Sequence, residues 1–302
     1  VQPSIIVNEF SESKAAMRDD PGFQAAMAKR GITDMSLVTI DPWTAGNYGD
    51  PYENNNRIVR GLVFVHGTPG DNQYARPIDG LTIIFDLNAN KVLRIDDERV
   101  LPVPEESAES AEWSRNHMPT DRERTDIKPL DITQPDGPSF QVHGDHLSWQ
   151  KWDLRVGWSS REGLVINTVT YTEGDKVRPV LYRASLAEMT VPYGDPSSTQ
   201  ARKNAFDAGE YGLGMLANSL ALGCDCLGEI HYLDALFCDA EGTVVEIPQA
   251  ICIHEEDFGI SWKHSDFRTK QTEVRRLRRL VVSFICTVGN YEYGVYWYFY
   301  QD

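Results

Sequence analysis

Hydrophobic and polar residues alternate along much of the chain, a spacing typical of half-buried β-strands. In the clearest case Trp152, Leu154, Val156 and Trp158 occupy every second position. Successive side chains of a strand point to opposite faces, so these four would share one buried face. Similar runs follow, rich in β-branched and aromatic residues, and predict strands at residues 164–171, 177–182, 230–237, 244–247, 280–287 and 293–300. This part of the chain predicts an antiparallel β-sandwich.

The first hundred residues predict a different arrangement, one helix beside several strands. Asp20 followed by Pro21 is an N-cap with proline at the first helical position, and Gly31 predicts the end of the helix. Strands are predicted at residues 35–40, 58–65, 81–87 and 92–95, with a hairpin turn at 88–90. A helix packed on a four-stranded antiparallel sheet is the simplest architecture for these elements.

Shifts in composition divide the chain into three predicted parts. Residues 1–100 form the small α+β domain, and residues 101–137, rich in proline, glutamate, serine and arginine, form a connecting segment. Residues 138–302 form the N-terminal part of the large antiparallel β-sandwich, so the fold is mainly β overall. The chain starts without methionine and ends inside a strand-like run, so we expect both ends to continue in a longer protein.

Net charge narrows the classes of partner. The chain carries 45 acidic and 29 basic residues, a formal charge of -16, which argues against electrostatic binding of nucleic acid or anionic membranes. No apolar run approaches the ~20 residues that span a bilayer, and we favour a soluble, cytoplasmic protein, although five cysteines do not identify a compartment. The one dense basic run is expected to form a solvated face paired with nearby acids: Arg275, Arg276, Arg278 and Arg279.

The most distinctive stretch is residues 287–294, Thr-Val-Gly-Asn-Tyr-Glu-Tyr-Gly. Its pattern predicts a strand that opens on a Gly-Asn turn, with Tyr291 between an amide and a carboxylate. It resembles the Thr-x-x-Asn-Tyr-(Asp/Glu)-Tyr signature of copper-containing primary amine oxidases that use topaquinone. The resemblance implies that Tyr291 is the precursor of that quinone, and the alternative is an ordinary tyrosine in a core strand.

Two further stretches resemble the same family, in its order and with spacings typical of bacterial members. Residues 206–211, Phe-Asp-Ala-Gly-Glu-Tyr, resemble the run whose aspartate is the catalytic base, which implies that role for Asp207. Residues 192–195, Pro-Tyr-Gly-Asp, resemble the turn whose tyrosine holds the quinone, and imply that Tyr193 and Asn290 orient the ring. A base for proton abstraction works best with a raised pKa, so we expect Asp207 to be largely buried near Phe206.

The resemblance also implies a substrate channel. Its walls would come from two stretches of the chain: Ala205, Phe206, Asp207, Gly209, Tyr211, Leu216, Val288, Gly289, Asn290, Tyr291 and Tyr293. Some relatives place a bulky aromatic two residues before the base, where this chain has Ala205, so a wider channel that accepts bulky aromatic amines is expected.

The implied reaction is oxidative deamination of a primary amine by O₂, yielding aldehyde, ammonia and hydrogen peroxide. The family binds copper through histidines after the quinone tyrosine, and this chain stops at Asp302, so the Cu²⁺ ligands are expected outside it, in a missing C-terminal portion. The fragment alone would then be inactive. The resemblance further implies a homodimer and a disulfide between Cys226 and Cys252. The other three cysteines, Cys224, Cys238 and Cys286, are then expected to be buried thiols.

Two alternatives remain open at this point. One is a non-catalytic β-sandwich interaction module derived from the same scaffold. The other is a zinc protein built on His254 and His264, which stand among carboxylates. Their spacing matches no standard zinc motif, so we expect a structural role for them.

Overall fold

The computed structural model describes residues 3–67, 72–105, 124–197 and 199–301. It forms two compact units, one of Val1–Lys128 with Met189–Glu210 and one of Pro129–Glu188 with Tyr211–Asp302. The N-terminal unit therefore includes residues 189–210, which the sequence pattern had assigned to the second domain. Residues 106–123 of the expected connecting segment lie outside the described residues.

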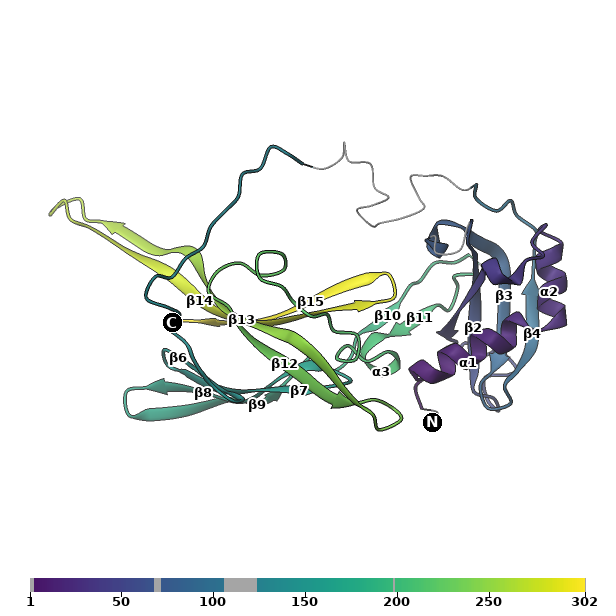
Figure 1. Ribbon diagram of the computed structural model, residues 1–302, viewed down its shortest axis with the longest axis horizontal. Coiled ribbons are helices and arrows are strands. Elements are labelled where there is room, and N and C mark those ends of the chain that lie inside the picture. The colour runs from purple at the N-terminus through teal and green to yellow at the C-terminus, as the bar shows by residue number, and fades with distance from the viewer. Residues whose placement is uncertain (1–2, 68–71, 106–123, 198, 302) are drawn as a thin grey trace. The chain divides into compact units, whose positions relative to one another are not determined.

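The N-terminal unit has two helices on one face of an antiparallel sheet (Figure 1). The helices are α1 (Val7–Arg18) and α2 (Pro21–Ala28), and the 3-10 turns are η1 (Met35–Leu37) and η2 (Gln73–Ala75). The sheet has the order β10-β11-β1-β2-β3-β4. Its strands are β1 (Val38–Thr44), β2 (Ile58–Val65), β3 (Pro77–Asp86), β4 (Lys91–Asp97), β10 (Thr190–Pro192) and β11 (Asn204–Phe206).

The predicted helix is confirmed as α2, and α1 is an addition. The Asp20 carboxylate accepts a hydrogen bond from the Phe23 amide at 2.9 Å, with Pro21 in the first turn. By contrast α1 starts after Ile6, whose side chain is not a hydrogen-bonding cap, so the usual start signal is missing there.

Close packing of α1 on the sheet depends on Gly61 in β2. A Cβ atom at this position would lie 2.7 Å from the Met17 sulfur and 2.9 Å from Ile40. Met17 is fully buried, as are Phe23 and Met27 of the helices and the facing strand residues Leu81, Ile83 and Phe85. The absence of a side chain at Gly61 therefore lets the helix approach the sheet.

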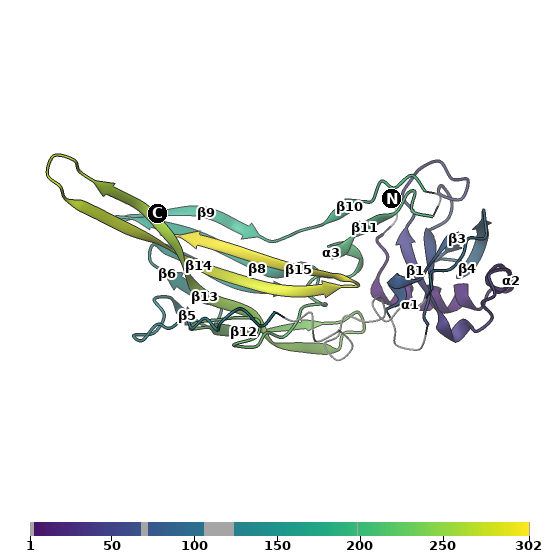
Figure 2. The same ribbon diagram turned by 90° about the horizontal axis from the view of Figure 1, so that it is seen from above.

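The second unit stacks two antiparallel sheets, as expected for a sandwich (Figure 2). One sheet contains β5 (Gln141–His143), β6 (His146–Trp149), β7 (Trp152–Ser159), β8 (Gly163–Glu173) and β9 (Lys176–Ala184). The other contains β12 (His231–Cys238), β13 (Val244–Ser265), β14 (Thr272–Val288) and β15 (Tyr291–Tyr300). Aromatic contacts join the sheets, since the ring centroids of Trp152 and Phe299 lie 5.4 Å apart and those of Trp158 and Phe284 lie 5.2 Å apart.

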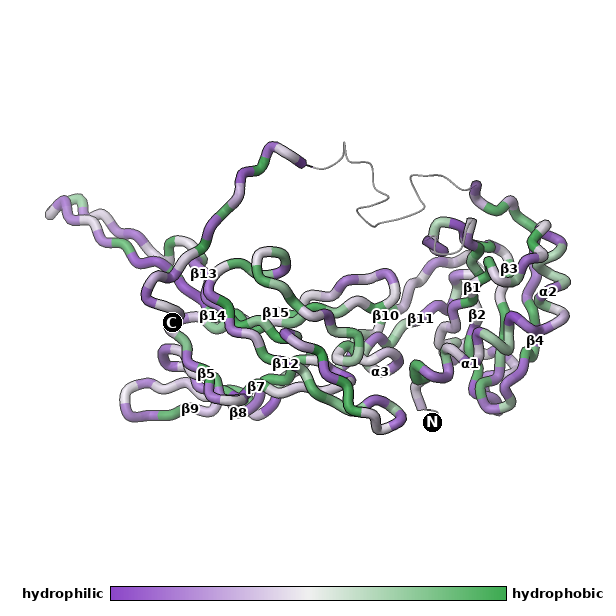
Figure 3. Tube along the Cα trace, in the orientation of Figure 1, coloured by the Kyte–Doolittle hydropathy of each residue, from purple (hydrophilic) through white to green (hydrophobic). Residues whose placement is uncertain are grey.

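The β13–β14 hairpin is much longer than predicted, with strands of 22 and 17 residues. Its outer part is largely hydrophilic (Figure 3). Arginines of β14 pair there with acids of β13, as when Arg276 bonds to Asp257 at 2.5 Å and Arg279 to Glu256 at 2.6 Å. The expected pairing of this basic run with nearby acids is thus confirmed, but Arg279 is only 16% exposed and is not part of a solvated face. Charged pairs took the place of hydrophobic alternation, so the pattern did not reveal the strand ends.

Tight turns close the predicted hairpins. In β8–β9, Glu173 pairs with Lys176, and the intervening Gly174 has a φ of 59°. In β14–β15, Val288 pairs with Tyr291, and Gly289 has a φ of 60°. Positive φ at the first central position is what two-residue hairpin turns require, and glycine adopts it freely. Among the described residues, no helix combines the length and apolar character that crossing a bilayer requires.

Candidate active site

Asp207 begins the short helix α3 (Asp207–Glu210), directly after β11. Its backbone N–H donates to the Met189 carbonyl at 3.3 Å, which ties the helix start to the chain before β10. The Asp207 side chain is buried at 5% exposure, as expected from the sequence. Burial penalises the ionised form of a carboxyl group, so this position suits a proton acceptor.

Glu210 closes the same helical turn and was not singled out in the sequence. Its carboxylate accepts a hydrogen bond from the Phe206 amide at 3.1 Å and another from the Thr44 hydroxyl of β1. Glu210 is 4% exposed, so both bonds are shielded from water. These bonds attach the turn that carries Asp207 to β1. The sequence signal that could have identified Glu210 was its position three residues after Asp207, which makes the two side chains neighbours on one helical turn.

Tyr193 is held beside β1 by a lysine and a tryptophan. Its ring makes an edge contact with Trp43 at 5.4 Å between centroids. The Lys203 ammonium lies 4.2 Å from the Tyr193 ring centre and 4.0 Å from that of Trp43. Burial lowers the pKa of Lys203, partly offset by the Asp41 carboxylate. The cation therefore fixes the two rings relative to each other.

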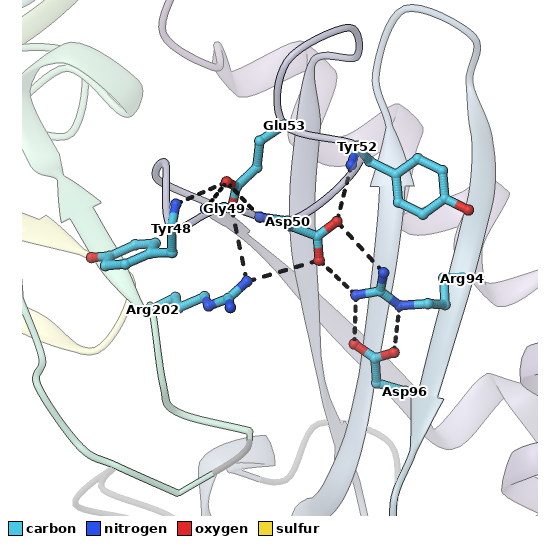
Figure 4. A network of polar contacts seen from close by, with 8 residues as sticks. All are labelled: Tyr48, Gly49, Asp50, Tyr52, Glu53, Arg94, Asp96 and Arg202. Atoms are coloured by element: carbon cyan, nitrogen blue, oxygen red, sulfur yellow. Dashed lines mark hydrogen bonds and ion pairs between the residues drawn. The ribbon is translucent and has the colours of Figure 1, made fainter.

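A network of charged side chains anchors the segment that leads into β11 (Figure 4). Arg94 bonds to Asp50 at 2.7 Å and to Asp96 at 2.6 Å, and Arg202 lies 3.8 Å from both Asp50 and Glu53. The Arg94 guanidinium holds the pKa of Asp50 below its usual value. The side chains of Asp50 and Glu53 are only 6% and 3% exposed, so the two arginines hold the segment to two buried carboxylates.

Thr199 makes a second attachment of this segment to the sheet. Its hydroxyl donates to the Asp79 carboxylate at 2.7 Å and accepts from the Gly80 amide at 2.8 Å. Thr199 is 5% exposed. The approach to β11 and α3 is therefore fixed at several points of the N-terminal unit, and sequence reasoning identified none of these contacts because they join residues far apart in the chain.

A cleft of about 500 Å³ opens beside α3 within the N-terminal unit. Phe206, Glu210, Glu53 and Arg57 belong to its walls. Arg57 is paired with the two carboxylate oxygens of Glu9, so its charge is already balanced. The lining thus holds two carboxylates, Glu53 and Glu210, and one guanidinium, a composition that favours a cationic ligand over an anionic one.

Tyr291 lies at the tip of the β14–β15 hairpin in the second unit, with 46% of its surface exposed. Its ring stacks on that of Tyr293 at a centroid distance of 6.3 Å and an interplanar angle of 17°. The two tyrosines are two positions apart in one strand, so they share a face. Asn290 is exposed in the turn, and Val288 is buried at 4% exposure.

The loop that follows α3 in the chain, in the second unit, runs beside this hairpin. The Leu216 carbonyl accepts a hydrogen bond from the Thr287 amide at 3.1 Å, and the Asn218 side chain donates to the Thr287 hydroxyl at 3.0 Å. The loop also approaches the β7–β8 turn closely, since a Cβ atom on Gly214 would lie 2.0 Å from the Ser159 carbonyl. Leu216 is therefore brought close to the tip of the hairpin that carries Tyr291, because Thr287 pairs with Glu292, the residue after Tyr291.

The predicted site residues thus fall into two clusters, one in each unit. The first contains Tyr193, Ala205, Phe206, Asp207 and Gly209. The second contains Tyr211, Leu216, Val288, Gly289, Asn290, Tyr291 and Tyr293. Ala205 is buried at 3% exposure and pairs with Val191 of β10.

The histidines of β13 do not form a shared metal site. His254 and His264 lie in one strand, ten residues apart, a separation of about 33 Å at the usual rise per residue. His254 instead contacts Cys252 and Glu256. Across the described part of the chain, no three His, Cys, Asp or Glu side chains gather as metal ligands. These residues do not fit a copper or zinc ion.

Cys226 and Cys252 are free thiols in the structure and pack in one buried cluster with Leu220. Their disulfide stays a prediction. Cys286 is a buried thiol, as expected, whereas Cys224 and Cys238 are exposed rather than buried. Cys224 lies in the loop before β12, and Cys238 is the last residue of β12. The sequence pattern did not distinguish these positions from the interior.

Two family models match the chain. Residues 141–302 match the enzyme domain of copper amine oxidases, and residues 8–113 match their N3 domain. The enzyme-domain match covers more than half of the 302 residues.

Individual proteins show the same likeness. The chain is 49% identical to a primary amine oxidase of Arthrobacter sp. (strain P1), over all of this chain and 46% of that protein. It is 46% identical to a histamine oxidase of Arthrobacter globiformis, over all of this chain and 43% of the relative. A crystal structure of a copper-containing benzylamine oxidase from Hansenula polymorpha aligns with a TM-score of 0.78 at 34% identity, covering 100% of this chain and 47% of that one. The chain spans less than half the length of these relatives.

Proposed function

The chain belongs to the copper amine oxidase family, and we propose that it supplies the quinone precursor and the proton-abstracting base of a primary amine oxidase. The proposed reaction converts a primary amine and O₂ into aldehyde, ammonia and hydrogen peroxide. The observation that carries the proposal is the family match over a region that contains Tyr291, combined with a buried Asp207 at the start of α3.

Asp207 is the proposed base that removes a proton from the substrate carbon next to nitrogen. Its burial supports this role, because a desolvated carboxylate gains more by accepting a proton than a solvated one. The bonds from Thr44 and the Phe206 amide to Glu210 would keep the turn in place while the proton moves. A primary amine is cationic at neutral pH, and the neighbouring cleft, lined by the carboxylates of Glu53 and Glu210 and by one guanidinium, suits that charge.

Tyr291 is the proposed precursor of topaquinone, with Asn290 and Tyr193 orienting the ring. A quinone supplies an electrophilic carbonyl and accepts electrons, chemistry that no unmodified side chain offers. Tyr291 suits conversion to a quinone because it is 46% exposed, which leaves room around the ring for added oxygen atoms and for solvent. Stacking on Tyr293 would limit the tilt of the ring.

The proposal places the copper ligands in a part of the protein outside this chain. The described residues gather no set of copper ligands, so we derive no step through the metal. We propose that a C-terminal continuation supplies the histidines, and that two copies of the complete protein associate as a homodimer. Light scattering of the complete protein would test the dimer, and a monomer at micromolar concentration would contradict it.

The decisive experiment is a mass spectrum of the peptide that contains Tyr291. It should be taken from the longer polypeptide that carries this chain together with copper-binding histidines, after exposure to copper and air. Oxidised Tyr291 that reacts with phenylhydrazine would support the proposal, and Tyr291→Phe protein serves as the control. An unmodified Tyr291 in copper-loaded protein would favour a non-catalytic β-sandwich module.

A second variant tests the role of Asp207 as base separately from the oxidation of Tyr291. We expect Asp207→Ala protein to form the oxidised Tyr291 and to bind phenylhydrazine, yet to lose amine turnover by at least about a hundredfold, the usual contribution of a general base. Turnover equal to that of the unchanged protein would remove Asp207 from the mechanism.

The amine class is proposed from Ala205. A small side chain two residues before the base leaves room for a bulky aromatic amine. Relatives are named for methylamine and histamine, so the family accepts substrates of different size. We expect phenylethylamine or tyramine to be turned over faster than methylamine, and Ala205→Tyr to reverse the order. A preference for methylamine in the unchanged protein would contradict this.

A further inference from the structure

Lys203 places a positive charge on the same face of the N-terminal sheet as Ala205. Ala205 pairs with Val191 of β10. One step further along the two strands, the Lys203 carbonyl accepts a hydrogen bond from the Tyr193 amide at 3.0 Å. Side chains of a strand alternate between its two faces, so Lys203 and Ala205 point to the same side. The face to which Ala205 belongs therefore carries an ammonium group.

Two aromatic rings contact this ammonium group. Its nitrogen lies 4.0 Å from the centre of the Trp43 ring and 4.2 Å from that of Tyr193, and contact with two ring faces favours the charged form of the amine. Within the described part of the chain, no carboxylate forms an ion pair or hydrogen bond with Lys203. The carboxylate that acts on it electrostatically, Asp41, is instead paired with Lys14 at 3.3 Å. The charge of Lys203 is thus held in place without a direct counter-ion.

The opposite side of β11 is acidic. Phe206 points away from Ala205, since the two are neighbours in one strand, and it lines the cleft of about 500 Å³ beside α3. The carboxylates of Glu53 and Glu210 belong to the same cleft, together with one guanidinium. A cationic group is therefore attracted on the Phe206 side of the strand and repelled on the Ala205 side.

We propose that Lys203 makes the amine site selective for monoamines over diamines. This selectivity presupposes the proposed amine oxidation, with a substrate whose tail lies along Ala205. A monoamine presents an uncharged tail to this face, whereas a diamine brings a second ammonium group toward Lys203. Lys203 precedes the proposed base, Asp207, by four residues, a span of at most about 14 Å of extended chain. Two like unit charges about 10 Å apart near a protein surface repel enough to weaken binding roughly tenfold.

The test compares butylamine with putrescine, which differ by one amino group at the far end of the same carbon chain. It uses the longer polypeptide that carries this chain together with copper-binding histidines, and it measures kcat/KM for both amines at pH 7. We expect the unchanged protein to prefer butylamine, and Lys203→Gln to raise the putrescine-to-butylamine ratio at least about tenfold. Lys203→Arg keeps the charge and should keep the ratio. Lys176→Gln removes an exposed charge from β9 of the second unit and should also keep it.

The ratio separates charge repulsion from a structural role of Lys203. A displaced Tyr193 would slow both amines alike and leave their ratio unchanged. Salt screens repulsion between charges, so the ratio should rise with ionic strength in the unchanged protein and stay constant in Lys203→Gln. Lys203→Met provides the same measurements if the glutamine variant does not fold.

A further readout does not depend on turnover. Oxidised Tyr291 can be treated with phenylhydrazine or with a hydrazide that carries a quaternary ammonium group, and both adducts are followed by absorbance and mass. We expect Lys203→Gln to speed the reaction of the cationic reagent relative to phenylhydrazine, since the repelling charge is gone.

Three results would overturn the role of Lys203. A putrescine-to-butylamine ratio that is the same in Lys203→Gln as in the unchanged protein would remove this residue from amine selection. An unchanged protein that prefers putrescine would place the substrate tail on the acidic side of β11. Both results would leave amine oxidation itself intact. If neither amine is turned over and Tyr291 stays unmodified, the proposed function fails as well.

Discussion

Lys203 holds Tyr193 through both its main chain and its side chain. Its carbonyl accepts a hydrogen bond from the Tyr193 amide at 3.0 Å, and its ammonium lies 4.2 Å from the centre of the Tyr193 ring. The same ammonium lies 4.0 Å from the Trp43 ring. A single residue between β10 and β11 therefore sets the position of a tyrosine that the family resemblance places near the quinone.

Replacing Lys203 tests how much its cation contributes to the stability of the N-terminal unit. We expect Lys203→Gln to lower the free energy of unfolding by about 1 kcal/mol, the usual size of a partly buried cation–π contact. Lys203→Arg keeps a cation that can stack on both rings and should lose less. Urea unfolding at pH 7 measures both. Equal stability of the glutamine and arginine variants would show that the cation contributes nothing.

The bond from Thr44 to Glu210 gives a second prediction. Thr44→Val keeps the shape of the side chain but removes the hydroxyl donor, which leaves a buried carboxylate oxygen without that partner. We expect a loss of about 1–3 kcal/mol in the free energy of unfolding, whereas Thr44→Ser should stay close to the original. In the complete protein, the valine variant should also lower the proposed amine turnover, because the turn that carries Asp207 loosens. A valine variant as stable as the serine variant would contradict this.

Glu162 predicts a pH dependence in the second unit. The Arg183 guanidinium, with bonds of 2.9 and 2.6 Å, lowers the pKa of Glu162 from 4.5 to about 2. A carboxyl group whose pKa is lowered on folding stabilises the protein above its unfolded value, and that contribution disappears as pH falls from 4.5 to about 2. We expect Glu162→Gln to cost about 1–2 kcal/mol at pH 7, after allowance for the half-exposed arginine, and much less at pH 3. A pH-independent difference in urea unfolding would refute the assignment.

Two carboxylates of β13 should differ sharply in their effect on stability. Glu255 is 7% exposed and accepts bonds from the Trp149 indole at 2.9 Å, the Ser139 amide at 2.7 Å and Gln134 at 2.8 Å. We expect Glu255→Gln to cost about 2–3 kcal/mol, since charged hydrogen bonds are lost from a buried position. Asp257→Asn, in an exposed pair with Arg276, should cost far less than that, and salt should reduce the loss further. Equal losses in thermal unfolding would contradict the distinction.

Local features of the chain predicted a large part of this structure. The cap at Asp20, the turns at Gly174 and Gly289, and the alternation from Trp152 to Trp158 all appear where the sequence indicated. Each depends on neighbouring residues only, through backbone conformation or the alternation of side chains along a strand. The resemblance to copper amine oxidases, carried by three short motifs, was confirmed by the family models.

Contacts between distant residues decided the rest. Residues 190–206 join the sheet of the N-terminal unit because β11 pairs with Thr44 of β1 and because Thr199 and Arg202 bond to residues more than a hundred positions earlier. The length of the β13–β14 hairpin follows from charge pairs across strands, which leave no hydrophobic period in the outer part of either strand. The sequence by itself thus determined α2, the central part of most strands, the turns and the family. The tertiary structure decided the remaining elements, which strands pair and which polar groups are buried, since these depend on chain segments far apart in sequence.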